Sequence, residues 1–524
     1  MRTLQNPILP GFNPDPSVVR VDDDVYIITS TFEWFPGIPV YHSRDLVHWR
    51  PVGHVLTRRS QLDLRGVDHS YGVFAPMITH HDGTFYVIYT VVSKAAAWPL
   101  NGYPNYVVTA KRIEGPWSEP IHVNSLGFDP SLFFDEDGKA YVLYRMFDHR
   151  PNRPASPGIG LHEYDFQQQR AVGQPRLIAR PTWQDGLGIE GPHLLKHNGY
   201  YYLFTAEGGT GRTHAETVWR AEHVFGPYEY SPYNPLLTSA HDETLPLQNA
   251  GHGQVVQTPT GQWYMTHLCV RRNQDGKSPI GRETAIQQLT YTDDDWFRLS
   301  HGEHHPLVDV PVPDLPAQPF PPEPERDEFD GPGLGPRWQS LREPCDKFWA
   351  KLADGKLLLK GRLPLSGRYG QSVLAQRITS LHAVAETVVE FEPRDFRHMA
   401  GLTCYNHSES FHYLYLSHDA ERSRNVLQIQ QVLNGKCRAP MAEAVDVGNA
   451  TRVFMMATIC DNTLQYAYAL EEGQWRDIGP ALDFSGLGGG YTGSMIGLSA
   501  QDFLYATQWA AFDYFRYRAL GEPL

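Results

Sequence analysis

Cysteine is scarce in this sequence, and the few residues present are scattered. The 524 residues include only Cys269, Cys345, Cys404, Cys437 and Cys460. No two of them form a CxxC pair, and their number is odd. This pattern excludes a disulfide framework and a cysteine-based zinc site, so we expect reduced cysteines in the protein core.

Long apolar runs and an excess of positive charge are also missing. No run of about 18 apolar residues, the length that a membrane helix needs, occurs in the chain. The segment Met1–Pro7 contains no apolar core of a signal peptide, so we expect a cytoplasmic protein without a membrane partner. The net charge of −14 argues against nucleic acid as a partner, because phosphate binding needs a basic face.

Aromatic residues, by contrast, are abundant. They make up 12% of the chain, with 28 Tyr, 24 Phe and 12 Trp. Such side chains suit the pleated surface of a sheet and also the faces of sugars, so the composition favours an all-β protein without identifying a ligand. Because 524 residues are too many for one hydrophobic core, we expect at least two domains.

A turn followed by an aromatic and branched strand recurs five times in the N-terminal part of the chain. The copies are Asp22–Ile28, Asp82–Ile88, Asp137–Leu143, Asn198–Phe204 and Thr260–Thr266. Their starts are 55 to 62 residues apart, a spacing that suits four-stranded blades with some long loops. Residues 1–312 are therefore predicted to form a five-bladed β-propeller.

The composition changes at residues 307–326, which contain seven prolines. Such a stretch is extended and semi-rigid, and we assign residues 313–326 to a linker. Beyond it, short runs such as residues 411–416 and 426–432 alternate between apolar and polar side chains. Alternation of period two predicts antiparallel sheets with one buried face, so residues 327–524 are expected to form a β-sandwich of the concanavalin type.

Three carboxylates stand in similar frames beside proline, in the motifs NPDPS, FDPS and EGPH. Asp15, Asp129 and Glu190 precede the recurring strand of three different repeats at about the same phase. A propeller should therefore bring them together at one mouth of its channel. Because the residue before a proline favours extended backbone, we expect that conformation at Asp15 and Asp129. Ordinary turn formation is the alternative for each motif taken alone.

Three acids correspond to three tasks in the cleavage of a glycosidic bond. One carboxyl donates a proton to the leaving oxygen, and a second activates water or attacks the sugar. At neutral pH the donor has to stay protonated, and a third carboxylate nearby raises its pKa by like-charge repulsion. The count of three thus favours glycoside hydrolysis.

These motifs, with the GHG around His252 and the GRETA around Arg282, resemble glycoside hydrolase family 43. The likeness is greatest to the two-domain β-xylosidases of that family and covers essentially the whole chain. It implies an inverting mechanism in which Asp15 is the general base and Glu190 the general acid, while Asp129 raises the pKa of Glu190 and orients it. It also implies an exo-acting enzyme that releases xylose from the non-reducing end of β-1,4-xylooligosaccharides.

Two other functions stay open at this stage. One is α-L-arabinofuranosidase activity, alone or as a second activity, because both sugars are pentoses with similar hydroxyl arrays and the family hydrolyses both. The other is a carbohydrate-binding protein without catalysis, which should lack at least one carboxylate, whereas all three are present. The resemblance further implies a homo-oligomer, either a dimer or a tetramer.

The resemblance also assigns residues to the sugar pocket. Phe32 matches a lining aromatic residue, with core packing as the alternative. Arg282 matches an arginine near the pocket acids, with a structural ion pair as the alternative. Phe74 and Phe147 stand where tryptophan is common, and a smaller ring removes stacking area and an N–H donor. We expect all four to bind substrate.

His252 matches a histidine near the propeller axis that in some relatives helps to hold a divalent cation, often Ca2+, through water. We expect it to face the substrate site, and a packed histidine is the alternative; no cluster of acids with calcium-loop spacing accompanies it, and no cofactor is required. In these relatives an aromatic loop of the sandwich closes the pocket, and Phe503 is our candidate for that role. Residues 486–493, which are rich in glycine, are expected to form only a flexible loop.

Overall fold

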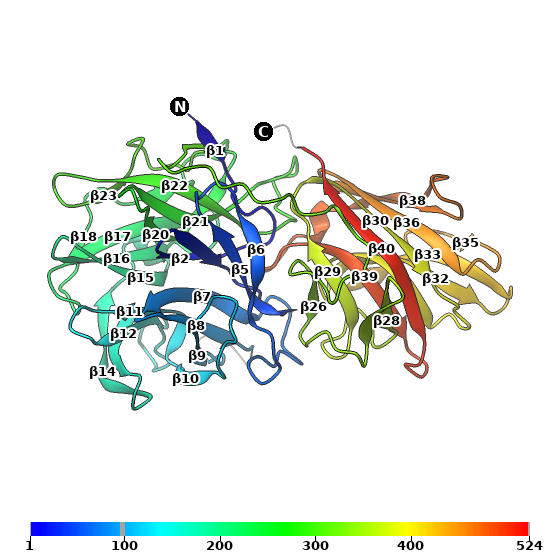
Figure 1. The fold of residues 1–524 in the computed structure, drawn as a ribbon, viewed down its shortest axis with the longest axis horizontal. Coiled ribbons are helices and arrows are strands. Elements are labelled where there is room, and N and C mark those ends of the chain that lie inside the picture. The colour runs from blue at the N-terminus through cyan, green and yellow to red at the C-terminus, as the bar shows by residue number, and fades with distance from the viewer. Residues whose placement is uncertain (1, 95–99, 522–524) are drawn as a thin grey trace.

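The computed structural model describes residues 2–94 and 100–521, which form two bodies built from strands (Figure 1). Within these ranges the only helical segments are two 3-10 turns, η1 (Trp183–Gly186) and η2 (Ser485–Leu487). No helix in the described ranges has the length and apolar character to cross a membrane. The predicted all-β fold is confirmed.

Five antiparallel blades form the N-terminal body, and the predicted propeller is thereby confirmed. In each blade the recurring turn joins the first strand to the second. The strands of the blades are β2 (Ser17–Val21), β3 (Asp24–Ile28), β5 (Gly37–Ser43) and β6 (Arg50–Leu56); β7 (Gly72–His81), β8 (Thr84–Val92), β9 (Asn105–Ala110) and β10 (Ile121–Asn124); β11 (Gly127–Phe134), β12 (Ala140–Met146), β13 (Gly158–Asp165) and β14 (Arg170–Ala179); β15 (Ile189–His197), β16 (Tyr200–Glu207), β17 (Ala215–Ala221), β18 (Glu229–Tyr230) and the extra β19 (Leu237–Thr238); and β20 (Gln248–Gln257), β21 (Trp263–Val270), β22 (Glu283–Tyr291) and β23 (Phe297–Leu299).

The N-terminal residues close the ring between the first and the fifth blade. β1 (Thr3–Gln5) pairs with β24 (Asp309–Pro311), and Leu9 forms a bridge with Thr284 on β22. The segment that leads to Asp15 is therefore held at the seam of the ring rather than free at a chain end.

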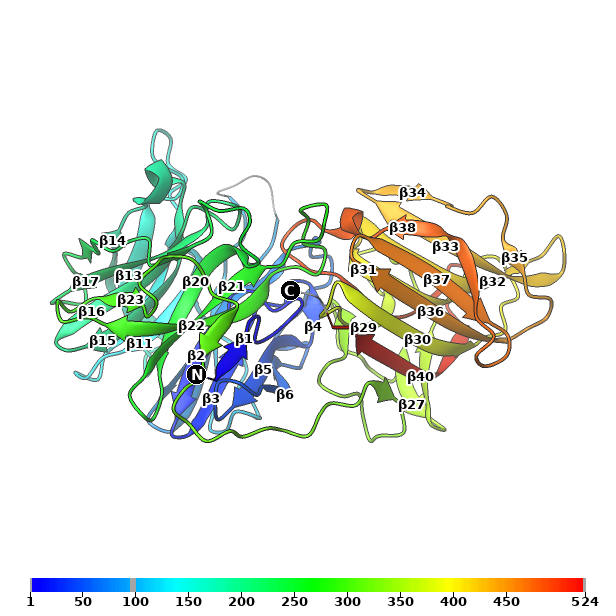
Figure 2. The ribbon, with the colours of Figure 1, turned by 90° about the horizontal axis from the view of Figure 1, so that it is seen from above.

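Residues 312–325 then run without a strand from the propeller to the second body (Figure 2). That body is a β-sandwich, as predicted, and Leu402, Met455, Leu498 and Phe512 are fully buried in its core. The strands of one sheet are β25 (Arg326–Asp327), β27 (Ala350–Ala353), β28 (Lys356–Lys360), β30 (His382–Glu390), β36 (Arg452–Cys460), β37 (Thr463–Ala469), β38 (Arg476–Asp483) and β40 (Trp509–Ala519). Those of the other are β4 (Trp34–Phe35), β26 (Gln339–Leu341), β29 (Ser372–Arg377), β31 (His398–His407), β32 (Ser410–Asp419), β33 (Arg424–Leu433), β34 (Lys436–Arg438), β35 (Val445–Asp446) and β39 (Met495–Asp502).

One strand of the second sheet comes from the propeller half of the chain. In β4, Phe35 pairs with Ser340 and Trp34 pairs with Leu341, both on β26. Trp34 is fully buried, and the N–H of Arg342 donates to the carbonyl oxygen of Glu33 at 2.9 Å. The two domains are thus joined by a shared sheet as well as by the linker, which the sequence did not predict.

The cysteine prediction holds only in part. Cys269 and Cys404 are buried, as expected, but Cys345, Cys437 and Cys460 are exposed. Cys437 lies on the short strand β34 and Cys460 is the last residue of β36, so neither position is covered by a second layer.

Candidate active site

The first strand of every blade directs one residue into the same pocket. Phe74 lies on β7, Asp129 on β11, Glu190 on β15 and His252 on β20, while Asp15 lies just before β2. All five line one cavity. The repeat phase therefore brings the three carboxylates together, as the sequence predicts.

A repeated bulge aims these side chains. The pairing of the first strand with the second shifts register next to the pocket residue in blades two to five. At these places the backbone is left-handed, with φ of 27° at Ala75, 52° at Asp129, 55° at Gly191 and 56° at His252, and φ is also 55° at Asp15. The extended backbone predicted for Asp15 and Asp129 is wrong; at Asp129 the bulge overrides the preference set by the following proline. Each non-glycine residue among them costs about 1–3 kcal/mol, strain that proteins concentrate at functional sites.

Asp15 is held as a buried carboxylate. Arg282 Nη1 lies 2.6 Å from its Oδ1, and the Ser30 hydroxyl donates to its Oδ2 at 2.6 Å. Burial alone would raise the pKa of Asp15, but the Arg282 charge and the Ser30 hydrogen bond outweigh it and keep the pKa below its ordinary value. Asp15 is therefore ionised at neutral pH and able to accept a proton.

The surroundings of Asp129 and Glu190 have the opposite effect to those of Asp15: they favour a protonated carboxyl. Burial raises the pKa of Asp129 well above its ordinary value, and the charges of Glu190 and Asp15 raise it further. The raised pKa that the structure resolves in this pair is that of Asp129. Because two neighbouring carboxylates repel each other, the proton that they bind belongs to the pair rather than to one residue. The site thus retains a proton at a pH where an isolated aspartate has lost it.

Arg145, which the sequence analysis missed, contacts the carboxylate of Glu190. It lies on β12, forms an ion pair with Glu190 through Nη1, and donates from Nε to Ser156 Oγ at 2.9 Å. Its guanidinium lies 5.2 Å from the ring centroid of Phe128 and 5.7 Å from that of Phe147. These contacts fix the orientation of Glu190. No sequence signal marks Arg145, because it stands inside a regular strand.

Aromatic rings and a loop of the sandwich wall the pocket, which has a volume of about 280 Å3. Phe32 lies 4.7 Å from Phe74 and 6.0 Å from Tyr491, between ring centroids. Tyr491 belongs to the glycine-rich loop of the sandwich, and its N–H donates to Ser70 Oγ at 3.1 Å while its carbonyl accepts from Arg282 Nη2 at 3.3 Å. The predicted pocket positions of Phe32, Phe74 and Arg282 agree with the structure.

Two other assignments change. Phe147 does not line the pocket; it stacks on Tyr103 at 4.7 Å, behind Phe128 and Arg145. Phe503 is 41% exposed and lies outside the pocket, so the closing aromatic residue is Tyr491. The reason is strand direction: Tyr491 precedes β39 and Phe503 follows it, so they lie at opposite ends of a strand about 25 Å long.

His252 packs beside the carboxylates of the pocket, and no group of metal-ligating side chains surrounds it among the described residues. Its Nδ1 lies 3.9 Å from Asp15 Oδ1, and a Cβ at Gly191 would lie only 2.7 Å from its Nε2, so only glycine fits after Glu190. Burial keeps the pKa of His252 below its ordinary value. In the described part of the chain, no group of three or more His, Cys, Asp or Glu residues is arranged to hold a metal ion. A divalent cation held beside His252 through water therefore stays a prediction.

Comparisons with known proteins match both domains. Residues 4–297 match the model of "Glycosyl hydrolases family 43", and residues 326–518 match that of the "Beta xylosidase C-terminal Concanavalin A-like domain". A xylan 1,3-beta-xylosidase of Vibrio sp is 44% identical over 98% of this chain and 99% of its own, and a xylosidase/arabinosidase 43B of Humicola insolens is 42% identical over 100% and 99%. The crystal structure of xylan beta-1,4-xylosidase from Bacillus halodurans C-125 superposes with a TM-score of 0.95 at 44% identity, covering 98% of this chain and 100% of that one.

Proposed function

Because this chain belongs to glycosyl hydrolases family 43, we propose that it is an exo-acting, inverting glycoside hydrolase that releases xylose from the non-reducing end of short β-xylooligosaccharides. One observation carries the proposal. A single small pocket holds an ionised carboxylate, Asp15, opposite a pair of carboxyls, Asp129 and Glu190, that retains a proton. Inverting hydrolysis needs these two protonation states at the same time.

Asp15 acts as the general base. Arg282 and Ser30 hold both of its oxygens at 2.6 Å, so the carboxylate cannot turn away from the pocket. A water beside it loses a proton to Asp15 as its oxygen attacks the anomeric carbon.

Glu190 acts as the general acid, and Asp129, whose pKa is raised by burial and by the Glu190 charge, keeps a proton within the pair. Asp129 also accepts the N–H of Gly191 at 3.2 Å, which fixes the backbone directly after Glu190. Arg145 has to yield the Glu190 carboxyl when the glycosidic oxygen of the substrate approaches, because a carboxyl in an ion pair has no proton to donate.

The size of the pocket supports exo action. A volume of about 280 Å3 lies at the lower end of ligand pockets, which hold about 300–1,000 Å3, and suits one sugar unit. Phe32, Phe74 and Tyr491 surround this space. A chain end fits such a site, whereas the middle of a polymer does not.

The linkage and the second pentose need direct tests. The two relatives at 44% identity are named for 1,3- and 1,4-xylosidase activity, and the Humicola insolens relative is named for both xylosidase and arabinosidase activity. We expect β-xylosidase activity to exceed α-L-arabinofuranosidase activity on nitrophenyl pentosides. Parallel assays on 1,3- and 1,4-linked xylobiose identify the linkage.

The stereochemistry of the first product tests the mechanism. Proton NMR during early turnover of a β-xyloside should show α-xylose before mutarotation, and initial β-xylose would refute the role of Asp15 as base. Asp15→Asn should lower kcat about 10²–10⁴-fold. Ser118→Ala, at a partly exposed residue of blade two that does not line the pocket, serves as the control and should retain full turnover.

A further inference from the structure

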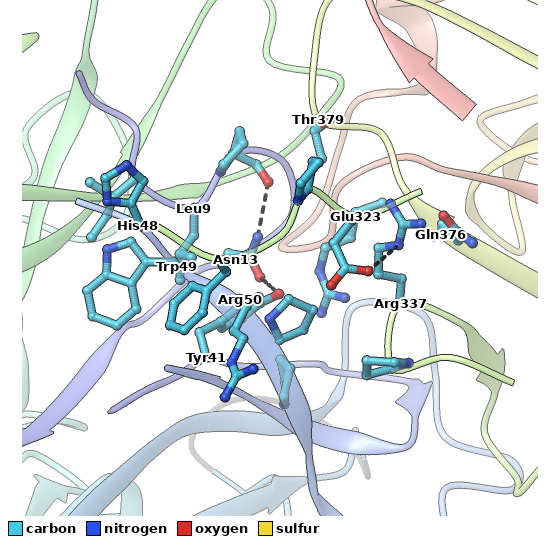
Figure 3. Close-up of a pocket in the computed structure, with 18 of the residues that line it drawn as sticks. Leu9, Asn13, Tyr41, His48, Trp49, Arg50, Glu323, Arg337, Gln376 and Thr379 are labelled. Carbon is cyan, nitrogen blue, oxygen red and sulfur yellow. Dashed lines mark hydrogen bonds and ion pairs between the residues drawn. The ribbon is translucent and has the colours of Figure 1, made fainter. Parts of the chain in front are cut away.

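A second cavity lies between the propeller and the sandwich, away from the three carboxylates (Figure 3). We call it the interdomain cleft. It has a volume of about 500 Å3 and is lined, among others, by Tyr41, Trp49, Arg50, Phe320, Gln376 and Arg377. Blade one, the proline-rich linker and the sandwich all contribute to it. Its volume falls within the range of about 300–1,000 Å3 that small-molecule sites occupy.

Three arginines, Arg50, Arg337 and Arg377, line the cleft on a protein whose net charge is −14. Glu323 also lines it and forms an ion pair with Arg337 at 3.9 Å, which leaves Arg50 and Arg377 as the charges that no lining carboxylate pairs. Arg50 stacks on the Phe320 ring at 4.5 Å, and Arg377 donates from Nε to the Phe12 carbonyl oxygen at 2.6 Å. Among the residues that the structure describes, no carboxylate forms an ion pair with either arginine. His54 does not balance them, because burial and then the Arg377 charge lower its pKa to about 3 and leave it neutral.

Two polar side chains at the cleft have hydrogen-bonding groups without a protein partner in the described part of the chain. Arg377 is 9% exposed, and its Nη2 is buried without a hydrogen bond in the described part of the chain. Gln376 is 5% exposed, and its side-chain amide makes no hydrogen bond to another described residue. An unpaired buried donor such as Arg377 Nη2 costs free energy, and the Gln376 amide is free to form a hydrogen bond with a ligand. Tyr41 and Trp49 add aromatic surface, so the cleft offers charge, hydrogen bonding and ring faces together.

One segment that lines the cleft leads directly into the active site. Asn13 lines the cleft and accepts the Tyr41 hydroxyl at 2.6 Å, and its own N–H donates to the Arg282 carbonyl oxygen at 2.9 Å. Two residues later the same segment presents Asp15 to Arg282. A ligand that orders this segment therefore acts on the backbone that positions the base.

We propose that the interdomain cleft binds a small sugar acid, whose carboxylate lies against Arg50 and Arg377, and that its binding tightens substrate binding at the active site. The ligand contacts both domains. It thereby holds the sandwich, which supplies Tyr491 to the active site, in register with the propeller.

Isothermal titration with D-glucuronate tests the site without relying on turnover. Wild type should bind glucuronate, and D-xylose present at saturation in the active site should tighten that binding, because coupling between two sites is reciprocal. Arg50→Gln and Gln376→Leu should each weaken binding about tenfold or more, as expected for a charge-assisted hydrogen bond or a buried one. Arg44→Gln is the matched control, because Arg44 is an exposed arginine of the same blade that pairs with Asp24 and does not line the cleft.

Several results would overturn the proposal. The first is that wild type fails to bind glucuronate, and the second is that xylose displaces it. The third is that Arg50→Gln binds glucuronate with the same affinity as wild type, and the last is that the protein binds phosphate but not glucuronate. In kinetics, glucuronate should lower the KM of wild type for a nitrophenyl β-xyloside about fivefold and should leave the KM of Arg50→Gln unchanged. An unchanged KM in wild type would refute the coupling between the two sites.

Discussion

Replacing Asp129 by asparagine should make the protein more stable, and the gain should grow as the pH rises. The folded state raises the pKa of Asp129 through burial and through the charges of Glu190 and Asp15. Between the unfolded value of about 3.9 and this raised value, the native protein binds more protons than the unfolded chain. Stability therefore falls with increasing pH across that window because of this one group. An asparagine has no proton to lose, and the penalty disappears.

The size of the effect follows from linkage. One proton bound only in the native state changes the free energy of unfolding by about 1.4 kcal/mol per pH unit. Asparagine keeps the volume of the side chain and an oxygen that accepts the Gly191 N–H, and it tolerates the φ of 52° at this position. We therefore expect Asp129→Asn to gain at least 1 kcal/mol over wild type by about pH 6, with little difference near pH 4.

Thermal melts of both proteins between pH 4 and 7 measure this gap. Asp135→Asn is a matched control of opposite sign. Burial alone would raise the pKa of Asp135, but hydrogen bonds from Lys196 at 2.9 Å and Tyr201 at 2.6 Å lower it. The stability that ionised Asp135 contributes is present above the unfolded pKa and is lost as the pH falls. Asp135→Asn should therefore be less stable than wild type at neutral pH. A gap for Asp129→Asn that does not change with pH would refute the reasoning.

Three further predictions concern the pocket. Glu190→Gln should lower kcat on xylobiose about 10²–10⁴-fold and cost less on an aryl xyloside whose leaving group needs no proton, whereas equal losses would contradict its role as the acid. Arg145→Met removes a charge that lowers the pKa of Asp129, so that pKa should rise further in the variant. In thermal melts, the decrease in stability with increasing pH should therefore extend to a higher pH than in wild type, and an unchanged upper pH would contradict this. Tyr491→Ala should raise the KM for xylobiose about 2- to 12-fold, the loss expected for one aromatic contact, while Phe503→Ala should leave it unchanged; the reverse would place the closing residue at Phe503.

The sequence predicted those parts of the site that repeat. Asp15, Asp129 and Glu190 share a phase within the blade pattern, so their convergence follows from the fold class. The shared bulge could not be foreseen, because a register shift depends on two strands and leaves no mark on either. It turned the backbone of Asp129 to the left-handed region, against the preference set by proline, whereas Asp15 is left-handed without such a shift.

The parts that do not repeat were harder to predict. Tyr491 reaches the pocket from the other domain, and its loop was interpreted as flexible because glycine composition describes the loop and not its neighbours. Arg145 and Phe147 stand two residues apart, yet only Arg145 lines the pocket. Side chains alternate along a strand, but Phe147 follows the end of β12, where that rule stops applying.

The short strand β4 has a consequence for how this protein can be divided or have arisen. Cutting the chain at the linker would separate β26 from β4. The sandwich half would then carry an open sheet edge of the kind that promotes aggregation, and the propeller half would carry the unpaired residues 34–35 with Trp34 facing water. Neither half is an interchangeable module. Recombination at the proline-rich segment should yield insoluble hybrids unless both partners keep the pairing of residues 34–35 with 340–341.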